Sequence, residues 1–275
     1  RVEETLATLM AYLEQRHIEY CVETATHVAL GTPGGPPGDF GEIASNCDLA
    51  VAVGGDGTLL AAARALVDRD VRLLGINLGR LGFLTDISPA DLEVRLDEVL
   101  AGKYLEERRF LLETDIVRAG TRLHHATCLN DVVVHKWRIA RLVELDVYVD
   151  GVFVNRQRSD GLIVSTPTGS TGYALSGGGP ILHPALNAIV LVPICPHTLS
   201  NRPIVVDAAS HIEITLSERE HTSAQLTCDG QTAMDLEAGD KVEVRRKARP
   251  IRLIHPPGHD YYAMLRTKLH WSREI

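Results

Sequence analysis

Residues 48–58, DLAVAVGGDGT, constrain the fold more than any other stretch of this chain. The apolar run LAVAV is typical of a strand buried on both faces. It passes directly into five turn residues: Gly54, Gly55, Asp56, Gly57 and Thr58. A helical pattern, LLAAARALV, follows them. A strand, a glycine turn and a helix predict an anion site, because glycine lets backbone N–H groups approach the anion and the helix N-terminus adds partial positive charge.

Asp56 is the candidate catalytic residue of this turn. Glycine turns after strands are common, and a purely structural turn would explain the glycines. It would not explain a carboxylate in an anion site, which is unfavourable unless the acid holds a metal ion or takes a proton from an attacking hydroxyl. The acid therefore favours phosphoryl transfer over phosphate binding alone.

The composition excludes several classes of protein. The chain has 275 residues, 45% hydrophobic and 23% charged, which is typical of a soluble globular protein with one large or two medium domains. A net charge of −8 predicts no nucleic acid partner and no membrane attachment. Apolar runs are shorter than the ~20 residues that span a bilayer, and no signal peptide is visible. We expect a cytoplasmic protein, with Arg1 allowing for a trimmed N-terminus.

The sequence predicts neither a disulfide framework nor a dedicated metal site. The cysteines are odd in number and widely spaced, which suits small buried residues in a reducing cytoplasm: Cys21, Cys47, Cys128, Cys195 and Cys228. Histidines, cysteines and acids show no metal-ligand spacing. Any metal should therefore be Mg²⁺ carried by nucleotide phosphates.

The first 103 residues alternate helical and strand patterns. Residues 2–16 predict a helix, 18–23 and 71–76 strands, and 31–38 and 79–86 loops. Ser88 and Pro89 predict a helix start, with Ser88 as N-cap. A doubly wound domain usually begins with a strand, whereas this chain begins within a helix, which indicates a further strand upstream.

From residue 104 the pattern changes to a period of two, as in LVELDVYVDGVFV, where Asp150-Gly151 predicts a hairpin. We predict an α/β N-terminal domain, Rossmann-like and doubly wound, at residues 1–103. A mostly β domain follows at 104–255. The tail, 256–275, should contain a short helix that packs back on the first domain.

Two further stretches carry candidate binding residues. Residues 159–180, SDGLIVSTPTGSTGYALSGGGP, combine hydroxyls and glycines, which suit a polyhydroxylated ligand with a purine edge or a turn-rich surface loop. Asn130 and Asp131 precede the strand VVV, where they form either a site at the rim of the sheet or a turn. The stretch 228–230, Cys-Asp-Gly, predicts only a hairpin turn.

Taken together, these stretches resemble the NAD kinase family over about residues 48–255. The matching motifs occur in the family's order: GGDGT (54–58), GINLGRLGFLTD (75–86), LNDVVVH (129–135), RSDGLIVSTPTGSTGYALSGGGPI (158–181) and PHTLSNRPIV (196–205). GGDGT alone is shared with diacylglycerol and sphingosine kinases and, loosely, with phosphofructokinases. The block rich in glycines and hydroxyls is the specific part.

The resemblance implies ATP-dependent phosphorylation of the adenosine ribose 2′-hydroxyl of NAD to NADP, with Mg²⁺ on ATP. It implies a dimer or tetramer and NAD bound between the two domains. Asp56 would orient or deprotonate the 2′-hydroxyl, and Gly54, Gly55, Gly57 and Thr58 would face phosphates. The implied NAD-binding residues are Phe83 closing over adenine, Asn130 and Asp131 holding adenine and ribose, Thr168, Thr171 and Tyr173 lining the adenine pocket, Asp160 at the nicotinamide end, and Arg158, Gly172 and Ser176.

One departure and two alternatives remain open. The family commonly has Asn-Glu where this chain has Asn130-Asp131, so the ribose contact should shift by about a methylene. A lipid kinase of the same superfamily is disfavoured by the negative charge and the lack of a basic amphipathic surface. A non-catalytic NADP-binding regulator is disfavoured by Asp56.

Overall fold

A computed structural model describes residues 1–31, 34–78, 82–85, 87–137, 141–217 and 224–271. The chain divides into two compact units, one of residues 1–108 and 251–275 and the other of residues 109–250. The predicted class, an α/β part followed by a mostly β part, is confirmed. No helix among the described residues is long and apolar enough to span a bilayer.

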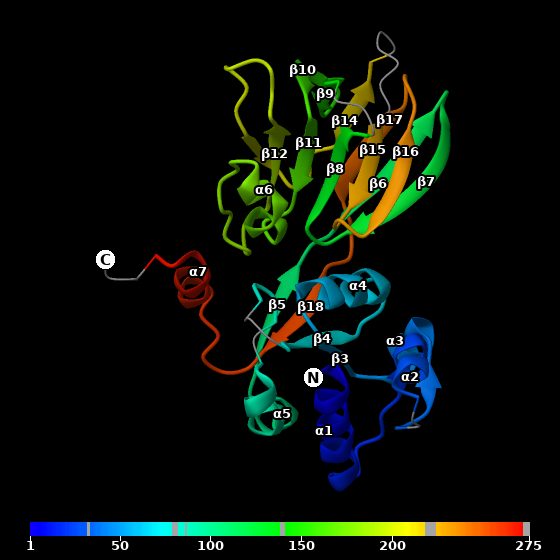
Figure 1. Ribbon diagram of the computed structural model, residues 1–275, viewed down its shortest axis with the longest axis vertical. Helices are drawn as coiled ribbons and strands as arrows, with labels where there is room; N and C mark the ends of the chain where they lie inside the picture. The colour runs from blue at the N-terminus through cyan, green and yellow to red at the C-terminus, as the bar shows by residue number, and fades with distance from the viewer. Residues whose placement is uncertain (32–33, 79–81, 86, 138–140, 218–223, 272–275) are drawn as a thin grey trace. The chain divides into compact units, whose positions relative to one another are not determined.

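The first unit is built on a sheet with the strand order β3-β4-β18-β5 (Figure 1). Strands β3 and β18 both pair in parallel with β4, as a doubly wound domain requires. The elements of this unit are α1 (Val2–Gln15), β1 (Val22–Glu23), α2 (Thr24–Leu30), β2 (Pro37–Gly38), α3 (Phe40–Asn46), β3 (Leu49–Val53), α4 (Asp56–Leu66), β4 (Arg72–Ile76), the 3-10 turn η1 (Pro89–Asp91), α5 (Leu92–Leu100), β5 (Leu105–Arg109), β18 (Ile251–His255) and α7 (Tyr261–Leu269).

Helices cover both faces of this sheet (Figure 1). Alternate residues of β4 point to opposite faces. Leu74 and Ile76 pack in one core with apolar residues of α1 and α5, such as Tyr12 and Leu96. On the other face Gly75 leaves room for Leu59 of α4, because a Cβ at Gly75 would lie 2.7 Å from Leu59 Cδ1. The buried strand and the helix after the glycine turn are thereby fixed against the same strand.

Two short stretches of this unit differ from the predictions. The predicted strand at 18–23 is reduced to β1, because Glu23 accepts hydrogen bonds from Ala25 N and Thr26 N and starts helix α2. Part of the predicted loop 31–38 forms β2, which pairs in parallel with β1; residues 32 and 33 lie outside the described part.

Ser88 is a further correction. Its Oγ donates to Asp91 Oδ2 at 2.7 Å and caps no backbone N–H, so the helix begins through a 3-10 turn. In the predicted loop 79–86, residues 79–81 and 86 lie outside the described part.

The second unit consists of two antiparallel sheets, with strand orders β10-β9-β14-β17-β6-β7 and β13-β12-β11-β8-β15-β16. Its elements are β6 (Leu112–Arg118), β7 (Thr121–Cys128), β8 (Asp131–Lys136), β9 (Val143–Val149), β10 (Val152–Ser159), β11 (Gly161–Ser165), the 3-10 turn η2 (Gly169–Thr171), α6 (Tyr173–Ser176), β12 (Ala188–Ile194), β13 (Ile204–Asp207), β14 (Ile212–Leu216), β15 (Ala224–Cys228), β16 (Thr232–Leu236) and β17 (Lys241–Arg246).

The apolar alternation of the strands forms the core of this unit. Val132 and Val134 of β8 pack with residues of the other sheet, such as Leu145 and Ile214, in a cluster that is almost wholly buried. Between them in sequence, Val133 points to the opposite face of its sheet and packs near Ala174 of α6. The predicted Asp150-Gly151 hairpin joins β9 to β10, with φ of 52° and 76° at the two turn residues.

The unit boundaries differ from those predicted from sequence by one strand at each end. Strand β18 pairs with β4, and β5 belongs to the same sheet, so residues 104–108 and 251–255 lie in the first unit. The sequences of β5 and β18 alternate with a period of two, like those of the second unit. Periodicity predicts a strand but not the sheet that the strand joins.

Candidate active site

Asp56 is the first residue of α4, directly after Gly55, the N-cap residue. Its carboxylate accepts hydrogen bonds from the backbone N–H groups of Phe83 (2.9 Å, to Oδ2) and Leu84 (3.2 Å, to Oδ1). Thr85 Oγ1 lies 3.4 Å from Oδ1. The segment 82–85 therefore fixes the orientation of the carboxylate at the N-terminus of the helix.

The glycine turn is tightly packed around this acid. Gly54 N donates to Ile76 O at 2.9 Å, which ties the turn to β4. A Cβ at Gly54 would overlap the side chain of Thr58, whereas nothing lies within 4 Å of a Cβ at Gly55. The backbone of Gly55 is therefore accessible to a ligand, and the first N–H groups of α4 carry the positive end of the helix dipole.

Gly82 provides a test of the contact between the turn and the segment 82–85. A Cβ at Gly82 would overlap Asp56 Oδ1 and Thr85 Oγ1, so the segment or the acid must move. We expect Gly82→Ala to lower kcat by about 10²-fold, the effect of displacing a catalytic group by about 1 Å. Steady-state kinetics measures it.

Gly38→Ala is the matched control, because the nearest atom to its new Cβ lies at an ordinary contact distance of 3.5 Å. Turnover of Gly82→Ala within twofold of the control would show that the position of the segment does not matter for catalysis.

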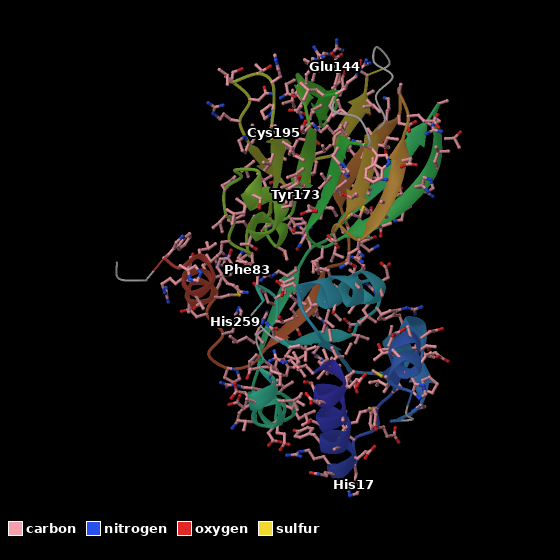
Figure 2. The ribbon with its side chains drawn as sticks, viewed as in Figure 1. His17, Phe83, Glu144, Tyr173, Cys195 and His259 are labelled. Atoms are coloured by element: carbon pink, nitrogen blue, oxygen red, sulfur yellow. The ribbon has the colours of Figure 1, made fainter. Side chains whose placement is uncertain are left out.

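Phe83 holds Asp56 through its backbone, while its ring has a separate partner. Lys268 Nζ of α7 lies 5.5 Å from the centroid of the Phe83 ring, within cation–π range. The ring is half-buried in the first unit (Figure 2). Its predicted contact with adenine stays a prediction.

The second unit contains a polar cavity of about 470 Å³. It runs along β8, from Asn130 and Asp131 at the start of this strand to Lys136 at its end, and reaches the start of α6, where Tyr173 is labelled in Figure 2. Its walls are formed by Asn130, Asp131, Val133, His135, Lys136, Asp160, Tyr173, Ile194, Thr227, Asp229 and Gly230. The structure thus brings together four of the predicted NAD-binding residues: Asn130, Asp131, Asp160 and Tyr173.

The polar groups of the cavity are unequally satisfied. Lys136 Nζ and Asp160 Oδ1 form an ion pair at 2.6 Å, so each offsets the charge of the other. By contrast, Asn130 Oδ1 is buried without a hydrogen-bond partner. A buried acceptor of this kind is costly unless a ligand or water donates to it. The side-chain oxygen of Asn130 is therefore the best candidate in this wall for a hydrogen bond to a ligand.

Asp131 is the most perturbed carboxyl group of the cavity. Its side chain is 5% exposed, and burial, with the charge of Asp229 as a second cause, raises its pKa to about 7. Near pH 7 the group therefore exchanges between a carboxyl that donates a hydrogen bond and a carboxylate that only accepts them.

The raised pKa predicts a pH-dependent effect on stability. Because the folded pKa lies above the unfolded value, the unfolded chain loses this proton first, and the free energy of unfolding falls as pH rises from about 4 to about 7. Asp131→Asn removes this ionisation. We expect the Tm of the variant relative to wild type to be several degrees higher at pH 8 than at pH 5.

Differential scanning calorimetry at both pH values measures the effect. Asp150→Asn is the control, because the backbone N–H of His211, with Ser210, holds the pKa of Asp150 below its usual range. The Tm of Asp150→Asn minus that of wild type should be the same at pH 5 and pH 8. If the Tm difference between Asp131→Asn and wild type were also the same at both pH values, Asp131 would already be ionised at pH 5.

Asp229 was missed as a functional residue from the sequence. The predicted hairpin turn is present, with Gln231 N donating to Cys228 O. In addition, the carboxylate of Asp229 accepts hydrogen bonds from Leu129 N (3.1 Å), Asn130 N (2.7 Å) and Asp131 N (3.3 Å). The backbone N–H of Asp229 in turn donates to Asp131 O at 3.0 Å. Asp229 therefore positions the two residues of the cavity wall that the sequence singled out.

The hydroxyls of residues 165–170 mostly bind the protein itself. Thr166 Oγ1 donates to Leu129 O at 2.6 Å, and Ser165 Oγ lies 3.2 Å from Asn130 O. Ser170 Oγ donates to Pro167 O at 2.6 Å. All three side chains are fully buried. Their function is to hold the backbone of the block against Asn130 rather than to face a ligand.

The remaining predicted NAD-binding residues do not line the cavity within the described chain. Thr168 is buried, and its Oγ1 accepts from Arg109 Nη1 at 3.0 Å; Thr171 Oγ1 donates to Thr168 O at 3.3 Å. Gly172 lies close to the site, because its Cβ would be 3.7 Å from Asn130 Nδ2. Arg158 and Ser176 are exposed, outside the cavity wall.

An oriented acid beside an anion site at a helix N-terminus suits the class of phosphotransferases, in which the protein positions the phosphates and the attacking hydroxyl. Comparison with known proteins specifies the family. The ATP-NAD kinase N-terminal domain matches residues 40–104, and the ATP-NAD kinase C-terminal domain matches residues 129–256. The chain belongs to the NAD kinase family, which confirms the resemblance seen in the motifs.

Individual relatives agree with this assignment. The chain is 51% identical over 272 residues to the NAD kinase of Chromohalobacter salexigens, covering 99% of this chain and 93% of that protein. It is 50% identical over 278 residues to the NAD kinase of Hahella chejuensis, covering 99% and 92%.

Solved structures show the same fold. Yeast NADH kinase complexed with NADH is similar with a TM-score of 0.89 and 26% identity, covering 100% of this chain and 85% of that one. An NAD kinase from Archaeoglobus fulgidus in complex with ATP is similar with a TM-score of 0.70 and 31% identity, covering 90% and 93%.

Proposed function

We propose that this chain transfers the γ-phosphate of ATP to the adenosine ribose 2′-hydroxyl of NAD and so produces NADP. The observation that carries the proposal is the Asp56 carboxylate, held by the N–H groups of Phe83 and Leu84 at the start of α4. A protein that only binds NADP has no use for an oriented negative charge at an anion site. A kinase uses it to orient or deprotonate the attacking hydroxyl.

The geometry of Asp56 supports this role. A carboxylate has about four lone-pair positions, and the hydrogen bonds from residues 83–85 use about three of them. Among the residues that the structure describes, Oδ2 accepts a hydrogen bond from Phe83 N alone, which leaves it able to accept a substrate hydroxyl.

We assign the phosphates of ATP to the glycine turn. Gly54, Gly55, Gly57 and Thr58 surround the positive end of α4, where the exposed backbone of Gly55 and the hydroxyl of Thr58 suit an anion rather than a metal ion. Among the described residues, Asp56 belongs to no group of three metal-binding side chains. We therefore expect Mg²⁺ to be held chiefly by the phosphates of ATP. There the ion would neutralise charge on the transferred phosphate.

We assign NAD binding to the cavity of the second unit. Asn130 has the buried, unpaired carbonyl that an adenosine amine or hydroxyl can satisfy, and Asp131 can hold a ribose hydroxyl. Tyr173 is half-exposed at the start of α6, where its ring can stack on a base. Asp160, paired with Lys136, is assigned to the nicotinamide end.

Further parts of the proposal rest on the family. They are a cytoplasmic location and a homo-oligomer, dimer or tetramer. Size-exclusion chromatography with light scattering tests the oligomeric state, and a mass equal to one chain would contradict it.

The activity is tested by incubating the protein with ATP, Mg²⁺ and NAD and detecting NADP with an NADP-specific dehydrogenase. Parallel reactions replace NAD with NADH, ATP with polyphosphate, and NAD with diacylglycerol vesicles. We expect product from NAD with ATP and none from the vesicles. Tight binding of NADP without turnover would support the non-catalytic regulator instead.

A further inference from the structure

Three potential metal ligands that are not part of the glycine turn meet in the first unit. They are Glu107 of β5, His255 at the end of β18 and His259 in the connection to α7. Their ligand atoms all lie within 4.8 Å of one another, and His255 Nε2 is 3.2 Å from Glu107 Oε2. The imidazole rings of His255 and His259 are stacked, with centroids 3.9 Å apart and planes at 23°. Figure 2 labels His259 in this unit.

The spacing of these donors is close to that of a metal site. Donors bound at about 2.0–2.1 Å to a tetrahedral ion lie roughly 3.3 Å apart. The His255–Glu107 distance of 3.2 Å already meets this value. The third donor needs to move by at most about 1.5 Å, and the His259 ring must turn out of its stack on His255 so that the in-plane lone pairs of both rings point at one ion.

Burial and charge also favour a cation at this point. His255 is 2% exposed, and neutral imidazole is the form of histidine that binds metals. The carboxylate of Glu107 supplies a negative charge next to it. Two imidazoles and one carboxylate suit Zn²⁺ and related ions, whereas Mg²⁺ prefers oxygen ligands.

The group has space for a fourth ligand. His259 lies on the wall of a cavity of about 260 Å³, together with Asp91 and Asp260. The carboxylates of these two acids already accept hydrogen bonds, Asp91 from Ser88 Oγ and Asp260 from Tyr262 N. Water is therefore the fourth ligand that the surroundings offer.

We infer that Glu107, His255 and His259 form a binding site for a divalent transition-metal ion, of which Zn²⁺ is the best fit. The ion would join β5 to the connection between β18 and α7 and so fasten α7 to the sheet of the first unit. It is separate from the Mg²⁺ that accompanies ATP. The site was not predictable from sequence spacing, because Glu107 and His255 are 148 residues apart.

The test begins with protein that has been treated with a chelator and dialysed. Zn²⁺ binding is followed by calorimetry at pH 7.5, and Co²⁺ serves as a spectroscopic probe through its visible d–d absorption. We expect one tight equivalent per chain. Zn²⁺ should also raise the Tm, because it binds the folded state.

His259→Gln and Glu107→Gln are the informative variants, since His255 is buried and its replacement risks the fold. Each should weaken Zn²⁺ binding by at least about 10-fold and abolish the gain in Tm, with the metal-free Tm close to wild type. His211→Gln is the control, because His211 forms a comparable pair with Glu243 at 3.7 Å in the other unit. It should bind Zn²⁺ like wild type.

Three outcomes would overturn the inference. One is the absence of a tight equivalent in wild type. Another is unchanged Zn²⁺ affinity in both His259→Gln and Glu107→Gln. The third is a loss in His211→Gln as large as in these variants, which would mean adventitious binding to surface histidines only.

Discussion

Asp56→Asn is expected to lower kcat for NADP formation by about 10²-fold or more, while the KM for NAD changes little. The amide keeps the size of the side chain and one acceptor oxygen. It removes the charge and the ability to take a proton from the 2′-hydroxyl. Steady-state kinetics at saturating ATP and Mg²⁺, with circular dichroism and Tm as checks on the fold, measures the effect.

Asp70→Asn is the control for this variant. Asp70 is an exposed acid of the same unit, 3.0 Å from Arg252 in an ion pair, and lies outside the glycine turn. Its kcat should match wild type. Turnover of Asp56→Asn within threefold of the control would remove Asp56 from the catalytic step.

Asp229→Ala is the second large expected effect. It leaves the backbone N–H groups of Leu129, Asn130 and Asp131 without their charged acceptor, so the wall of the cavity shifts. A hydrogen bond to a charged group contributes about 1.5–3 kcal/mol, so the KM for NAD should rise by about 10-fold to 150-fold. The KM for ATP should stay nearly constant, because the hydrogen bonds that are lost hold the wall of the cavity assigned to NAD. Kinetics with each substrate varied in turn separates the two values.

Asp235→Ala is the matched control in the same hairpin. It removes one hydrogen bond, from Gln225 Nε2 at 3.0 Å, without touching the cavity wall. Its KM for NAD should be unchanged. Equal increases in both KM values for Asp229→Ala, or a fall in Tm alone, would assign Asp229 a purely structural role.

The local pattern of the sequence was sufficient for the main elements of the fold. The apolar run before the glycine turn forms β3, and the pattern after it forms α4, because burial and glycine conformation are local properties. The helix at residues 2–16 is α1, and the tail contains α7. The pairing of β18 with β4 was not predictable, because the paired residues, such as Arg252 and Arg72, are 180 positions apart in the chain and periodicity does not encode partners.

In the candidate site, too, local features were predictable from the sequence and long-range contacts were not. Asn130 and Asp131 were visible as polar residues ahead of a valine strand, and the structure places both on a cavity wall. Asp229 was read as a turn because its role depends on three N–H groups about 100 residues away. The hydroxyl block was read as a ligand surface, whereas Thr166 and Ser170 are buried and bind backbone carbonyls. Composition identifies polar groups, but only the fold determines which of them face a ligand.

The most direct test of the proposed phosphoryl transfer is ³¹P nuclear magnetic resonance of the reaction of wild-type protein with ATP, Mg²⁺ and NAD, with Asp56→Asn in parallel. We predict a new phosphomonoester signal, coupled to the proton on C2′ of the adenosine ribose, that grows in step with ADP in the wild type. In Asp56→Asn it should grow at least about 10²-fold more slowly. Inorganic phosphate without an ester on NAD, or an ester formed equally fast by Asp56→Asn, would contradict the proposed reaction or the role of this carboxylate.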